Sequence, residues 1–435
     1  MATIRTIVKK LIPRGVFKKI EPTGHLFESM LMNIRFGFPG RKVRIIGVTG
    51  TNGKTTSSFM IHRLLQDSGL KVGLMTTVAN GIGNDIVSQK EHMTTTKASI
   101  LQRRLRRFVD EGVQWAVIET SSHSLAQNRV WGIPYEIAVM TNITHDHLDY
   151  HGTFHNYVEA KRRLFKIANR HGLRYGIANA EDPNGLKFAK TVANSTTYGI
   201  KKGELRASDV VLAPDHSTYT ASIDDDIYKI RVNIPGEFNV FNSLAAVAVG
   251  RKLGLTKQQI EKGIAALKGV EGRMNIIDEG QKFKVIVDFA STPDGFEKFF
   301  DSVRPLTKGK LISVFGSAGR RDESKRSVQG VIAGKGSDIV IVTEEDDRDV
   351  DGQSILKQIA SGAKKSGKVE GKDLFLISDR EEAIGFALAQ ATQPDDVVVL
   401  LGKGHEKTIE RADGVYPWNE AEVARAALQE LKKSR

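Results

Sequence analysis

A glycine-rich loop is the first segment of the chain whose residue types suggest chemistry. Residues 50–56 read Gly-Thr-Asn-Gly-Lys-Thr-Thr and lie between a β-branched run and a helical apolar pattern. Glycines let backbone N–H groups approach phosphate oxygens, and a helix N-terminus adds positive potential. Lys54 could then reach the β- and γ-phosphates of a nucleotide, and Thr55 could hold Mg²⁺. The usual spacing wants a glycine where Val48 stands, so we interpret the segment as a shortened phosphate-binding loop. The alternative is a turn with an exposed lysine.

Acidic and histidine residues follow two further predicted strands. Glu119 ends one of them, where a carboxylate beside a phosphate-binding loop is well placed for a second Mg²⁺ contact. Residues 141–152 follow the other strand and are rich in His and Asp. Three interpretations stay open for this segment: a Mg²⁺ site with oxygen ligands and one histidine nearby, a zinc site through the histidines, or a solvated polar loop.

The elements that must position these residues alternate between strand and helix. Strands are predicted at 42–48, 113–119 and 136–141, with a helix around 57–68, which indicates a parallel α/β sheet. Residues 218–230 alternate and predict antiparallel strands, followed by helices over 239–250 and 258–267. A second α/β series then has strands predicted at 283–288, 310–315, 339–343, 374–377 and 396–401.

We therefore predict an α/β protein with two folded domains. A central domain of the phosphate-loop ATPase type, with a parallel sheet, would cover residues 43–273. A Rossmann-like α/β domain would cover residues 274–435, with the boundary near Arg273. Residues 1–42 form a short basic leader, in which Ile4, Ile7, Val8 and Leu11 have helical spacing and Pro13 and Pro22 are expected to interrupt the helix.

Composition narrows the classes of function. The 435 residues contain no cysteine, which excludes disulfides, thiolate metal sites and a cysteine nucleophile. The net charge of +13 invites a nucleic-acid interpretation, but residues 1–44 alone carry ten Lys or Arg against two Glu. The basic residues are not interleaved with aromatic ones as in nucleic-acid modules, so we expect no nucleic-acid partner. The sequence has neither a secretory signal pattern nor a long uncharged apolar run, and we expect a cytoplasmic monomer.

Four motifs in this order resemble those of the Mur ligase family. They are Gly47–Thr56, Glu119–His123, Thr141–Gly152 and Tyr157–Lys161. Within the family they are most similar to the members that add the third residue of the peptidoglycan stem peptide.

The resemblance implies an ATP-dependent amide-bond ligase that acts on a UDP-N-acetylmuramoyl-dipeptide in peptidoglycan precursor synthesis. ATP would phosphorylate a peptide carboxylate, and the amine of diaminopimelate or lysine would attack the acyl phosphate. Lys54, Glu119, His147 and Lys161 would be the catalytic residues. The family also implies that Thr55, Glu119, His147 and Lys161 support Mg²⁺, and that Lys161 matches a lysine that relatives carbamylate.

The same resemblance assigns the remaining site residues. ATP would be bound by Gly50, Thr51, Asn52, Gly53, Lys54, Thr55, Thr56, Asn242, Arg273 and Asp288. The muramoyl-peptide acceptor and the free amino acid would be bound by Thr94, Thr95, Ser121, Gln127, Arg129, Asp346, Arg348, Gly402 and Glu406.

The chain departs from the family pattern in its C-terminal half. Relatives that add diaminopimelate have Asp-Asn-Pro-Arg where residues 345–348 read Glu-Asp-Asp-Arg. Extra acids at the mouth of a pocket favour a lysine-like cationic side chain, whereas residues 402–406 match the diaminopimelate type. Ser291 stands where the family has a histidine, which motivates the alternative of a non-catalytic relative.

The other departure from the family pattern lies at the N-terminal end of the chain. About 42 residues precede the first predicted strand, too few for the family's N-terminal UDP-binding domain. The acceptor would then be a UDP-linked muramoyl peptide held partly by the leader, or a UDP-free acceptor of the folylpolyglutamate or cyanophycin synthetase kind. We further expect the basic leader to bind an anionic acceptor or to rest on an acidic surface such as a membrane.

Overall fold

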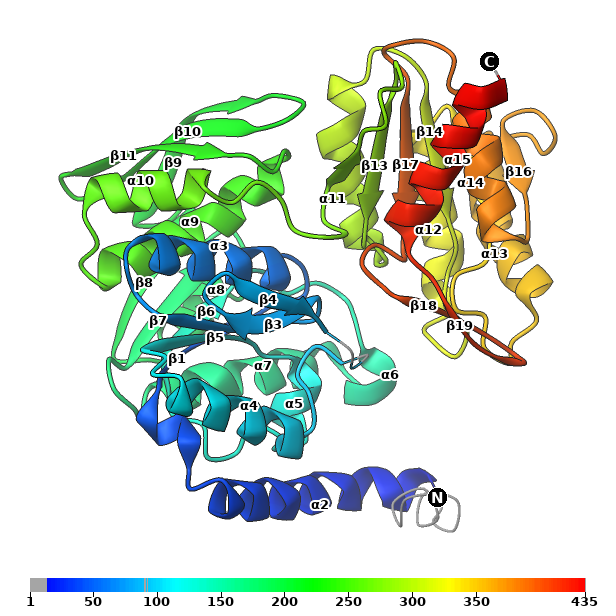
Figure 1. The fold of residues 1–435 in the computed structure, drawn as a ribbon. Helices are drawn as coiled ribbons and strands as arrows, with labels where there is room; N and C mark the ends of the chain where they lie inside the picture. The colour runs from blue at the N-terminus through cyan, green and yellow to red at the C-terminus, as the bar shows by residue number, and fades with distance from the viewer. Residues whose placement is uncertain (1–13, 90, 92, 435) are drawn as a thin grey trace.

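Two mixed β-sheets, each with helices packed on both faces, account for most of the structure (Figure 1). The computed structural model describes residues 14–89, 91 and 93–434. Within these residues the helix and strand alternation predicted from the sequence is confirmed, and the short antiparallel segments are found where residues 218–230 predicted them.

The first sheet has eleven strands in the order β11-β10-β9-β8-β7-β6-β1-β5-β2-β3-β4. The strands from β9 to β2 in that order are parallel, and antiparallel strands extend the sheet at both edges. The strands are β1 (Arg44–Thr49), β2 (Val72–Met75), β3 (Ala79–Ile82), β4 (Asp85–Ser88), β5 (Trp115–Glu119), β6 (Tyr135–Met140), β7 (Tyr175–Asn179), β8 (Asn194–Gly199), β9 (Leu205–Leu212), β10 (Ser217–Ile223) and β11 (Asp226–Val232).

Helices cover this sheet on both sides. Helices α3, α9 and α10 pack together over one face, while α4, α7 and α8 contribute to the core on the other. The helices of this half are α2 (Arg14–Arg35), η1 (Pro39–Lys42), α3 (Lys54–Asp67), α4 (Ala98–Asp110), α5 (Ser122–Ala126), α6 (Leu148–His151), α7 (Phe154–Ala168), α8 (Gly185–Ala189), α9 (Glu237–Lys252) and α10 (Lys257–Ala265).

The second sheet has six strands in the order β12-β13-β17-β14-β15-β16, and only β12 runs antiparallel to its neighbour. Its strands are β12 (Asn275–Ile277), β13 (Lys284–Asp288), β14 (Leu311–Phe315), β15 (Ile339–Val342), β16 (Leu374–Leu376) and β17 (Val397–Leu401), and a hairpin of β18 (Thr408–Arg411) and β19 (Gly414–Pro417) follows. Its helices are α11 (Pro293–Val303), η2 (Arg304–Leu306), α12 (Ser324–Gly336), α13 (Gly352–Lys365), α14 (Arg380–Gln390) and α15 (Glu420–Ser434).

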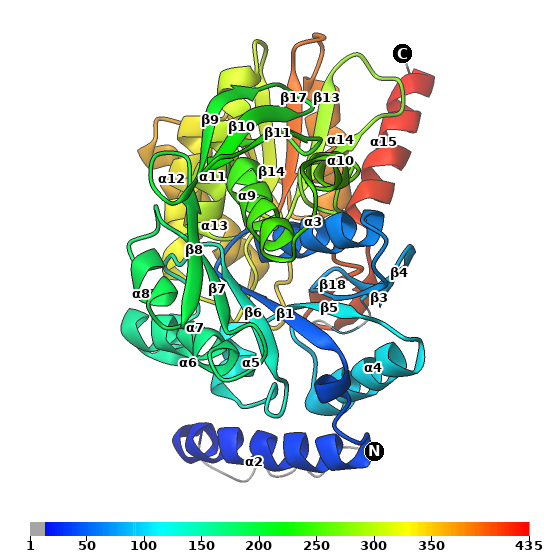
Figure 2. The ribbon, with the colours of Figure 1, turned by 90° about the vertical axis from the view of Figure 1, so that its left-hand side faces the viewer.

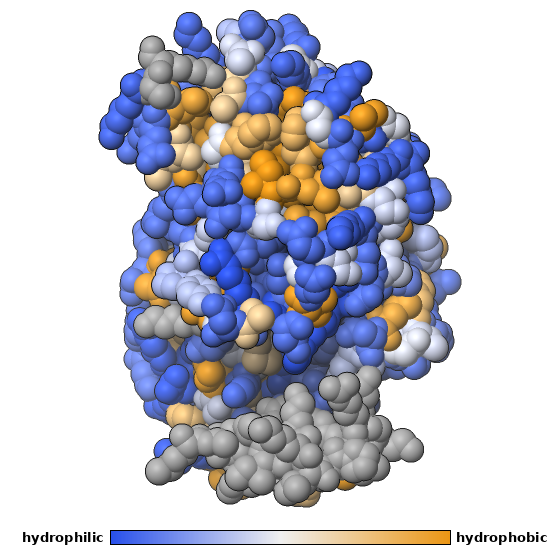
Figure 3. Space-filling model, turned by 90° about the vertical axis from the view of Figure 1, so that its right-hand side faces the viewer, coloured by the Kyte–Doolittle hydropathy of each residue, from blue (hydrophilic) through white to orange (hydrophobic). Residues whose placement is uncertain are grey.

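Residues 266–274 connect α10 to β12 and so join the two halves. We propose that the domain boundary lies in this connection, near Arg273. One hydrophobic cluster continues across it, from the α3 and α9 side of the first sheet to the α11 and α12 side of the second. In the space-filling view of the C-terminal side, hydrophilic residues cover most of the surface, with a hydrophobic patch in its upper half and smaller hydrophobic areas elsewhere (Figure 3). Most apolar side chains therefore lie in the cores.

The leader forms one helix where an interruption was expected. Helix α2 runs through Pro22, so the prediction that this proline breaks the helix is wrong. A proline removes one backbone hydrogen bond, but tertiary contacts can hold a helix together on both sides of it. Here Asn128 Nδ2 donates to Pro22 O (3.3 Å) and Ser29 Oγ donates to Asn128 O (2.9 Å). The expected spacing of residues 4–11 and the break at Pro13 lie outside the described residues.

Across residues 14–89, 91 and 93–434, the structure shows no helix with the length and hydrophobicity that a membrane span requires.

A buried ion pair ties the last helix to the second sheet. Arg380 and Glu420 are both fully buried, and the guanidinium Nη2 donates to Glu420 Oε1 over 2.6 Å. Arg380 also donates to the carbonyls of Glu344 (3.0 Å) and Leu401 (2.8 Å). Because it contacts α15 and the ends of two strands at once, Arg380 holds the loop that follows β15 in place.

We expect Glu420→Ala to lower the free energy of unfolding by about 3 to 5 kcal/mol, because it leaves a buried guanidinium unpaired. Chemical denaturation followed by circular dichroism measures this loss. Glu422→Ala, an exposed acid in the same helical turn, is the matched control and should change stability by less than about 1 kcal/mol. Equal effects of the two substitutions would contradict the role given to the pair.

Candidate active site

The glycine-rich loop connects β1 directly to α3, and two of its glycines have positive φ angles. Gly50 has φ +153° and Gly53 has φ +80°. A Cβ at Gly53 would collide with the carboxamide of Asn242, and one at Gly50 with the hydroxyl of Thr141. Only glycine fits at these two positions, and the loop can therefore lie close against both neighbours. The N–H groups of the first turn of α3 remain directed toward the open side of the loop.

Residues after β6 hold this loop from the side. Thr51 N donates to Asn142 O over 2.7 Å, and Asn52 N donates to Asn142 Oδ1 over 3.0 Å. In return, Thr141 Oγ1 donates to Asn52 O over 2.7 Å. The Thr51 hydroxyl also lies 3.0 Å from the Tyr157 hydroxyl. The loop is thus fixed in shape by side chains of the histidine-rich segment predicted to lie beside it.

Lys54, Thr55 and Glu119 meet at the ends of β1 and β5. Thr55 Oγ1 donates to Glu119 Oε2 over 2.9 Å, and Lys54 Nζ lies 3.9 Å from Glu119 Oε1. Lys54 Nζ also donates to Thr51 O over 2.8 Å. Burial lowers the pKa of Lys54, and the charge of Glu119 acts against this shift. The three side chains are therefore within reach of a phosphate group bound on the open side of the loop.

The donor set at this point fits Mg²⁺. Thr55 and Glu119 supply a hydroxyl and a carboxylate oxygen, which are hard ligands, and Mg²⁺ usually takes one or two such groups together with waters and substrate phosphates. Across the part of the chain that the structure describes, no group of three or more His, Cys, Asp or Glu side chains could hold a metal ion. The zinc alternative for residues 141–152 is therefore not supported.

Beside the loop, three histidines contact one another and two tyrosines through edge-to-face and tilted rings. They are His123, His147, His151, Tyr150 and Tyr157. The ring of His123 lies 4.7 Å from that of His147, 4.4 Å from Tyr150 and 5.4 Å from His151, between ring centroids. Burial lowers the pKa of His123 to about 3, and the neighbouring His147 contributes to this shift. Burial also lowers the pKa of His147 to about 3, with a contribution from the positive charge of Lys161. These imidazoles are consequently neutral near pH 7 and suited to hydrogen bonding or ligation.

Lys161 is buried below the loop. Its Nζ donates to Gly50 O over 2.5 Å and lies 4.5 Å from the centre of the Tyr157 ring. Burial lowers the pKa of Lys161 well below its usual value, and the nearby positive charge of Lys54 lowers it further. Only 2% of the Lys161 surface is exposed, so this lysine does not lie on the solvent side of its helix.

The residues expected to hold the acceptor form one network next to Glu119. Thr95 Oγ1 donates to Glu119 O and Ser121 N donates to Thr95 Oγ1, each over 2.9 Å. Arg129 is buried and donates to Thr95 O. Gln127 Nε2 donates to Glu21 Oε2 of α2 over 3.4 Å, so the leader helix adjoins this group.

The residues expected to contact the nucleotide approach from two directions. Asn242, on α9, accepts a hydrogen bond from Ser57 Oγ (3.2 Å) and borders the loop. Asp288, at the end of β13, accepts from Met274 N and Ala290 N, each over 2.8 Å. Burial raises the pKa of Asp288, which the charge of Arg273 partly offsets. The Arg273 guanidinium itself lies 4.5 Å from the centre of the Phe289 ring.

The residues expected to select the amino acid already have partners among neighbouring protein groups. Asp346 Oδ1 accepts from Lys403 Nζ over 2.8 Å, and Lys403 Nζ also lies 2.6 Å from Glu406 Oε2. Arg348 donates from Nε to Glu410 Oε2 (2.9 Å) and from Nη1 to Gly319 O (2.7 Å). Asp346 and Arg348 thus line the cavity but already have these protein partners, and their assignment to the amino-acid site stays a prediction.

Glu345 is a residue that sequence reasoning missed. It borders the cavity between the two halves, and only 8% of its surface is exposed. Its carboxylate lies over Gly402, because a Cβ atom added to that glycine would be 2.7 Å from Glu345 Oε2. Its neighbour Glu344 is paired with Arg411. Among the described residues, no hydrogen bond or ion pair engages the Glu345 carboxylate. The sequence shows a run of four acids, and only the fold decides that Glu345 lines the cavity without a direct ion pair, whereas Asp347, which also has no direct ion pair, lies outside the lining.

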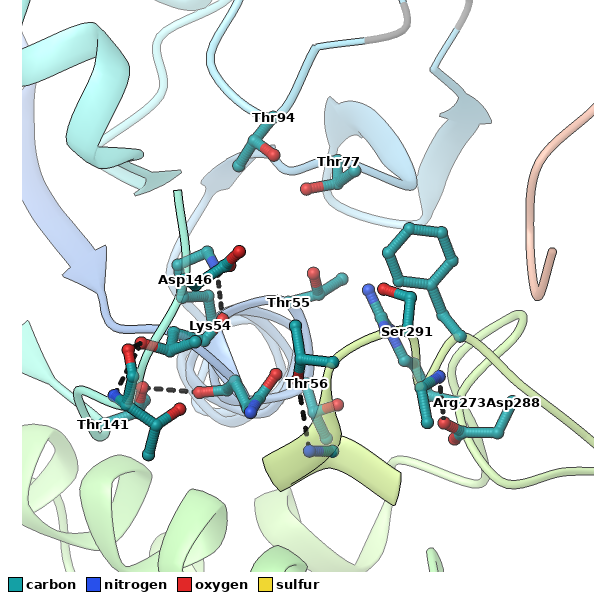
Figure 4. A pocket seen from close by; sticks show the side chains of 18 of the residues that line it. Lys54, Thr55, Thr56, Thr77, Thr94, Thr141, Asp146, Arg273, Asp288 and Ser291 are labelled. Carbon is teal, nitrogen blue, oxygen red and sulfur yellow. Dashed lines mark hydrogen bonds between the residues drawn. The ribbon is translucent and has the colours of Figure 1, made fainter. Parts of the chain in front are cut away.

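One cavity of about 1550 Å³ between the two halves brings these groups together. Figure 4 shows Lys54 and Asp146 on one side, Thr77 and Thr94 at the top, and Ser291 with Arg273 on the other side. The expected site residues that line it are Thr51, Asn52, Gly53, Lys54, Thr55, Thr56, Thr94, Glu119, His147, Asn242, Arg273, Asp288, Asp346, Arg348 and Glu406. Those outside its lining are Gly50, Thr95, Ser121, Gln127, Arg129, Lys161 and Gly402.

A second missed contact crosses the cavity. Asn52 Nδ2, in the glycine-rich loop, donates to Asp294 Oδ2 of α11 over 2.6 Å, and Lys298 Nζ donates to the same oxygen over 2.9 Å. Asn52 and Asp294 are 242 positions apart, so no local pattern could have paired them.

Comparisons with known proteins agree with this geometry. The Mur ligase middle domain matches residues 48–250, and the Mur ligase glutamate ligase domain matches residues 272–404. A UDP-N-acetylmuramyl-tripeptide synthetase of Roseiflexus sp. (strain RS-1) is 42% identical over 410 residues, which cover 91% of this chain and 80% of the relative.

Two solved structures are similar over almost the whole chain. A UDP-N-acetylmuramoyl-L-alanyl-D-glutamate--2,6-diaminopimelate ligase is 29% identical with a TM-score of 0.64, covering 95% of this chain and 83% of its own. A Mycobacterium tuberculosis folylpolyglutamate synthase has a TM-score of 0.73 at 17% identity, covering 99% and 98%, and shows a shared fold. Because both family domains match and a relative at 42% identity covers the chain, this protein belongs to the Mur ligase family of ATP-dependent amino-acid ligases.

Proposed function

We propose that this ligase uses ATP and Mg²⁺ to add a diamino acid, lysine or diaminopimelate, to a UDP-N-acetylmuramoyl-dipeptide in the cytoplasm, as a step of peptidoglycan precursor synthesis. The observation that carries the proposal is the cavity in which Lys54, Thr55 and Glu119 face Arg273 and the acidic loop of the other half. The names of the similar tripeptide synthetase and diaminopimelate ligase support the choice of acceptor and amino acid.

The geometry suggests how the chain performs this reaction. A peptide carboxylate attacks the γ-phosphorus of ATP, giving an acyl phosphate and ADP; the amine of the incoming amino acid then attacks the acyl carbon, and phosphate leaves. Lys54 and the N–H groups at the start of α3 would compensate the charge on the transferring phosphoryl group. Thr55 and Glu119 would hold Mg²⁺, which when bound screens the phosphate oxygens.

The positions of Arg273 and Asn242 support a nucleotide-binding site that spans the cavity between them. Arg273 stacks on Phe289 at the end of β13, and Asn242 lies against Gly53 on the opposite wall. Asn242 belongs to the first half, whereas Arg273 lies in the connection between the halves and contacts Phe289 of the second half. A nucleotide bound between them would bridge the halves and exclude water from the reacting groups.

The environment of Lys161 supports its carbamylation. Burial beside Lys54 lowers its pKa, so more of the amine is neutral at physiological pH. A neutral amine can form a C–N bond with CO₂ and release one proton to solvent, and this leaves a carbamate anion. The anion would lie against the glycine-rich loop next to the cavity, where it could help to orient the metal.

Glu345 gives the amino-acid site its unpaired negative charge. Asp346 is neutralised by Lys403 and Glu344 by Arg411, and Asp347 lies outside the cavity lining. Among these four acids, Glu345 is therefore the carboxylate suited to a side-chain ammonium. Arg348, the partner that a second carboxylate would need, is held by Glu410. We therefore propose that lysine is used more efficiently than diaminopimelate.

The first experiment measures phosphate release from ATP with each amino acid, using a UDP-muramoyl-dipeptide and a UDP-free analogue as acceptors. Release that needs both an acceptor and a diamino acid supports the proposal. Turnover with the UDP-free analogue alone would favour the folylpolyglutamate-like alternative, and no turnover with any pair would indicate a non-catalytic relative.

Lys54→Ala should lower phosphate release about 100- to 1000-fold, because charge on the transferring phosphoryl group would go uncompensated. The control is Lys71→Ala, an exposed lysine outside the cavity lining. Near-normal turnover in the Lys54 variant would show that the loop does not bind the reacting phosphates.

Lys161→Arg should lower kcat about 10- to 100-fold while the protein stays folded, as expected when a group that orients a metal is lost. The wild-type protein equilibrated with ¹³C-bicarbonate should show a carbamate carbon signal by NMR that the variant lacks. Lys166→Arg, on the exposed side of the same helix, should keep both the signal and the activity. A signal that persists in Lys161→Arg would assign the carbamate to another amine.

Glu345→Gln should raise the KM for lysine about 10- to 100-fold and leave the KM for ATP nearly unchanged, because a charged hydrogen bond is worth about 1.5 to 3 kcal/mol. Glu381→Gln, an exposed acid outside the cavity lining, is the control and should change neither constant. Parallel changes in both KM values would remove Glu345 from the amino-acid site.

A further inference from the structure

Helix α2 exposes an apolar stripe on its outer side. Ile20, Phe27, Leu31 and Ile34 are 52%, 62%, 61% and 66% exposed. Their spacing of seven, four and three residues places all four on one face of the helix. Contiguous apolar patches on a protein surface mark sites that bind another apolar surface.

The inner side of the same helix is polar, the reverse of an ordinary surface helix. His25, Ser29 and Asn33 are buried against the central domain. Ser29 Oγ donates to Asn128 O over 2.9 Å, and Asn33 Nδ2 donates to Trp131 O over 2.9 Å. Specific hydrogen bonds therefore fix the orientation in which the apolar residues point outward, and rotation of the helix to bury them would break these bonds.

The stripe lies apart from the site that performs the chemistry. Helix α2 lies along the lower end of the central domain, whereas the C-terminal domain lies beside its upper part, as two perpendicular views show (Figures 1 and 2). None of its four exposed apolar residues lines the cavity. A flat surface could thus contact the stripe along its length without closing the cavity.

Basic side chains continue beyond the stripe. Arg35, Arg41 and Lys42 are exposed, and within the described residues no carboxylate pairs with them. Burial lowers the pKa of His171, and the positive charges of Arg170 and Arg41 lower it further, so both arginines lie near this histidine. The first 44 residues carry ten Lys or Arg and two Glu. An apolar stripe with basic neighbours is the pattern of a helix that lies in a membrane interface.

We propose that the outer face of α2 binds a bilayer surface rich in anionic lipids. The apolar stripe enters the boundary between headgroups and acyl chains, and the basic residues contact the anionic headgroups. Charge selects this occupant over a second copy of the chain, because two such basic ends would repel each other. The ligase would then work at the membrane surface with its cavity still open.

The test is co-sedimentation of the full chain with vesicles of phosphatidylcholine alone or with one quarter phosphatidylglycerol. Binding should occur with the anionic vesicles and be weak with the neutral ones. The variant Phe27→Gln/Leu31→Gln/Ile34→Gln should lower the partition coefficient about tenfold or more, since three inserted side chains are lost. Arg35→Gln/Lys42→Gln should lower it severalfold, because each basic residue near the surface contributes to binding.

Matched controls distinguish binding through this face of α2 from non-specific adsorption to vesicles. Leu186→Gln and Val211→Gln remove exposed apolar side chains elsewhere, and Lys201→Gln/Lys202→Gln removes exposed charge elsewhere; all should bind like the wild type. Phosphate release with water-dissolved substrates reports folding of each variant. Failure to bind anionic vesicles, or binding unchanged by the triple substitution, overturns the proposal. Self-association that the triple variant abolishes, without vesicle binding, would assign the face to a second copy.

Discussion

The register of three parallel strands is the constraint on which the site depends. Strand β1 lies between β5 and β6, with Val48 paired to Glu119 and Thr49 paired to Met140. The carboxyl ends of all three strands therefore reach the same edge of the sheet, where ligands of open α/β sheets bind. The glycine-rich loop, the carboxylate and the segment after β6 meet there because the backbone hydrogen bonds of the sheet allow no other alignment.

Ion pairs then determine which charged side chains around the cavity are neutralised by protein partners and which are not. In the C-terminal half, Arg380, Arg411 and Lys403 hold the loop after β15 and neutralise two of its acids. Similar residue types thus have different surroundings: Asp346 is ion-paired with Lys403, whereas the Glu345 carboxylate takes part in none of the hydrogen bonds and ion pairs of the described residues. Around the glycine-rich loop burial has the corresponding effect, since it keeps His123 and His147 neutral and lowers the pKa of Lys161.

Much of the fold could be predicted from local patterns. The strands at 113–119 and 136–141 and the second α/β series were found within a few residues, because buried parallel strands are continuous apolar runs between turn signals. The continuation of α2 through Pro22 could not be predicted, since it depends on Asn128, more than a hundred residues away. The motifs indicated the glycine-rich loop, Thr55 and Glu119, which the structure brings together. They indicated neither the unpaired Glu345 nor the contact of Asn52 with Asp294.

The sequence by itself determined the chemistry that the protein can carry: a loop able to bind phosphate, hard oxygen ligands beside it, no thiol anywhere, and motifs that identify the Mur ligase family. These follow from residue types and short spacings, which local conformation preserves. Only the tertiary structure decided which charges stay unpaired, which amines have a lowered pKa and which face of α2 meets the surroundings. Those properties depend on burial and on partners distant in the chain, and no local pattern encodes either.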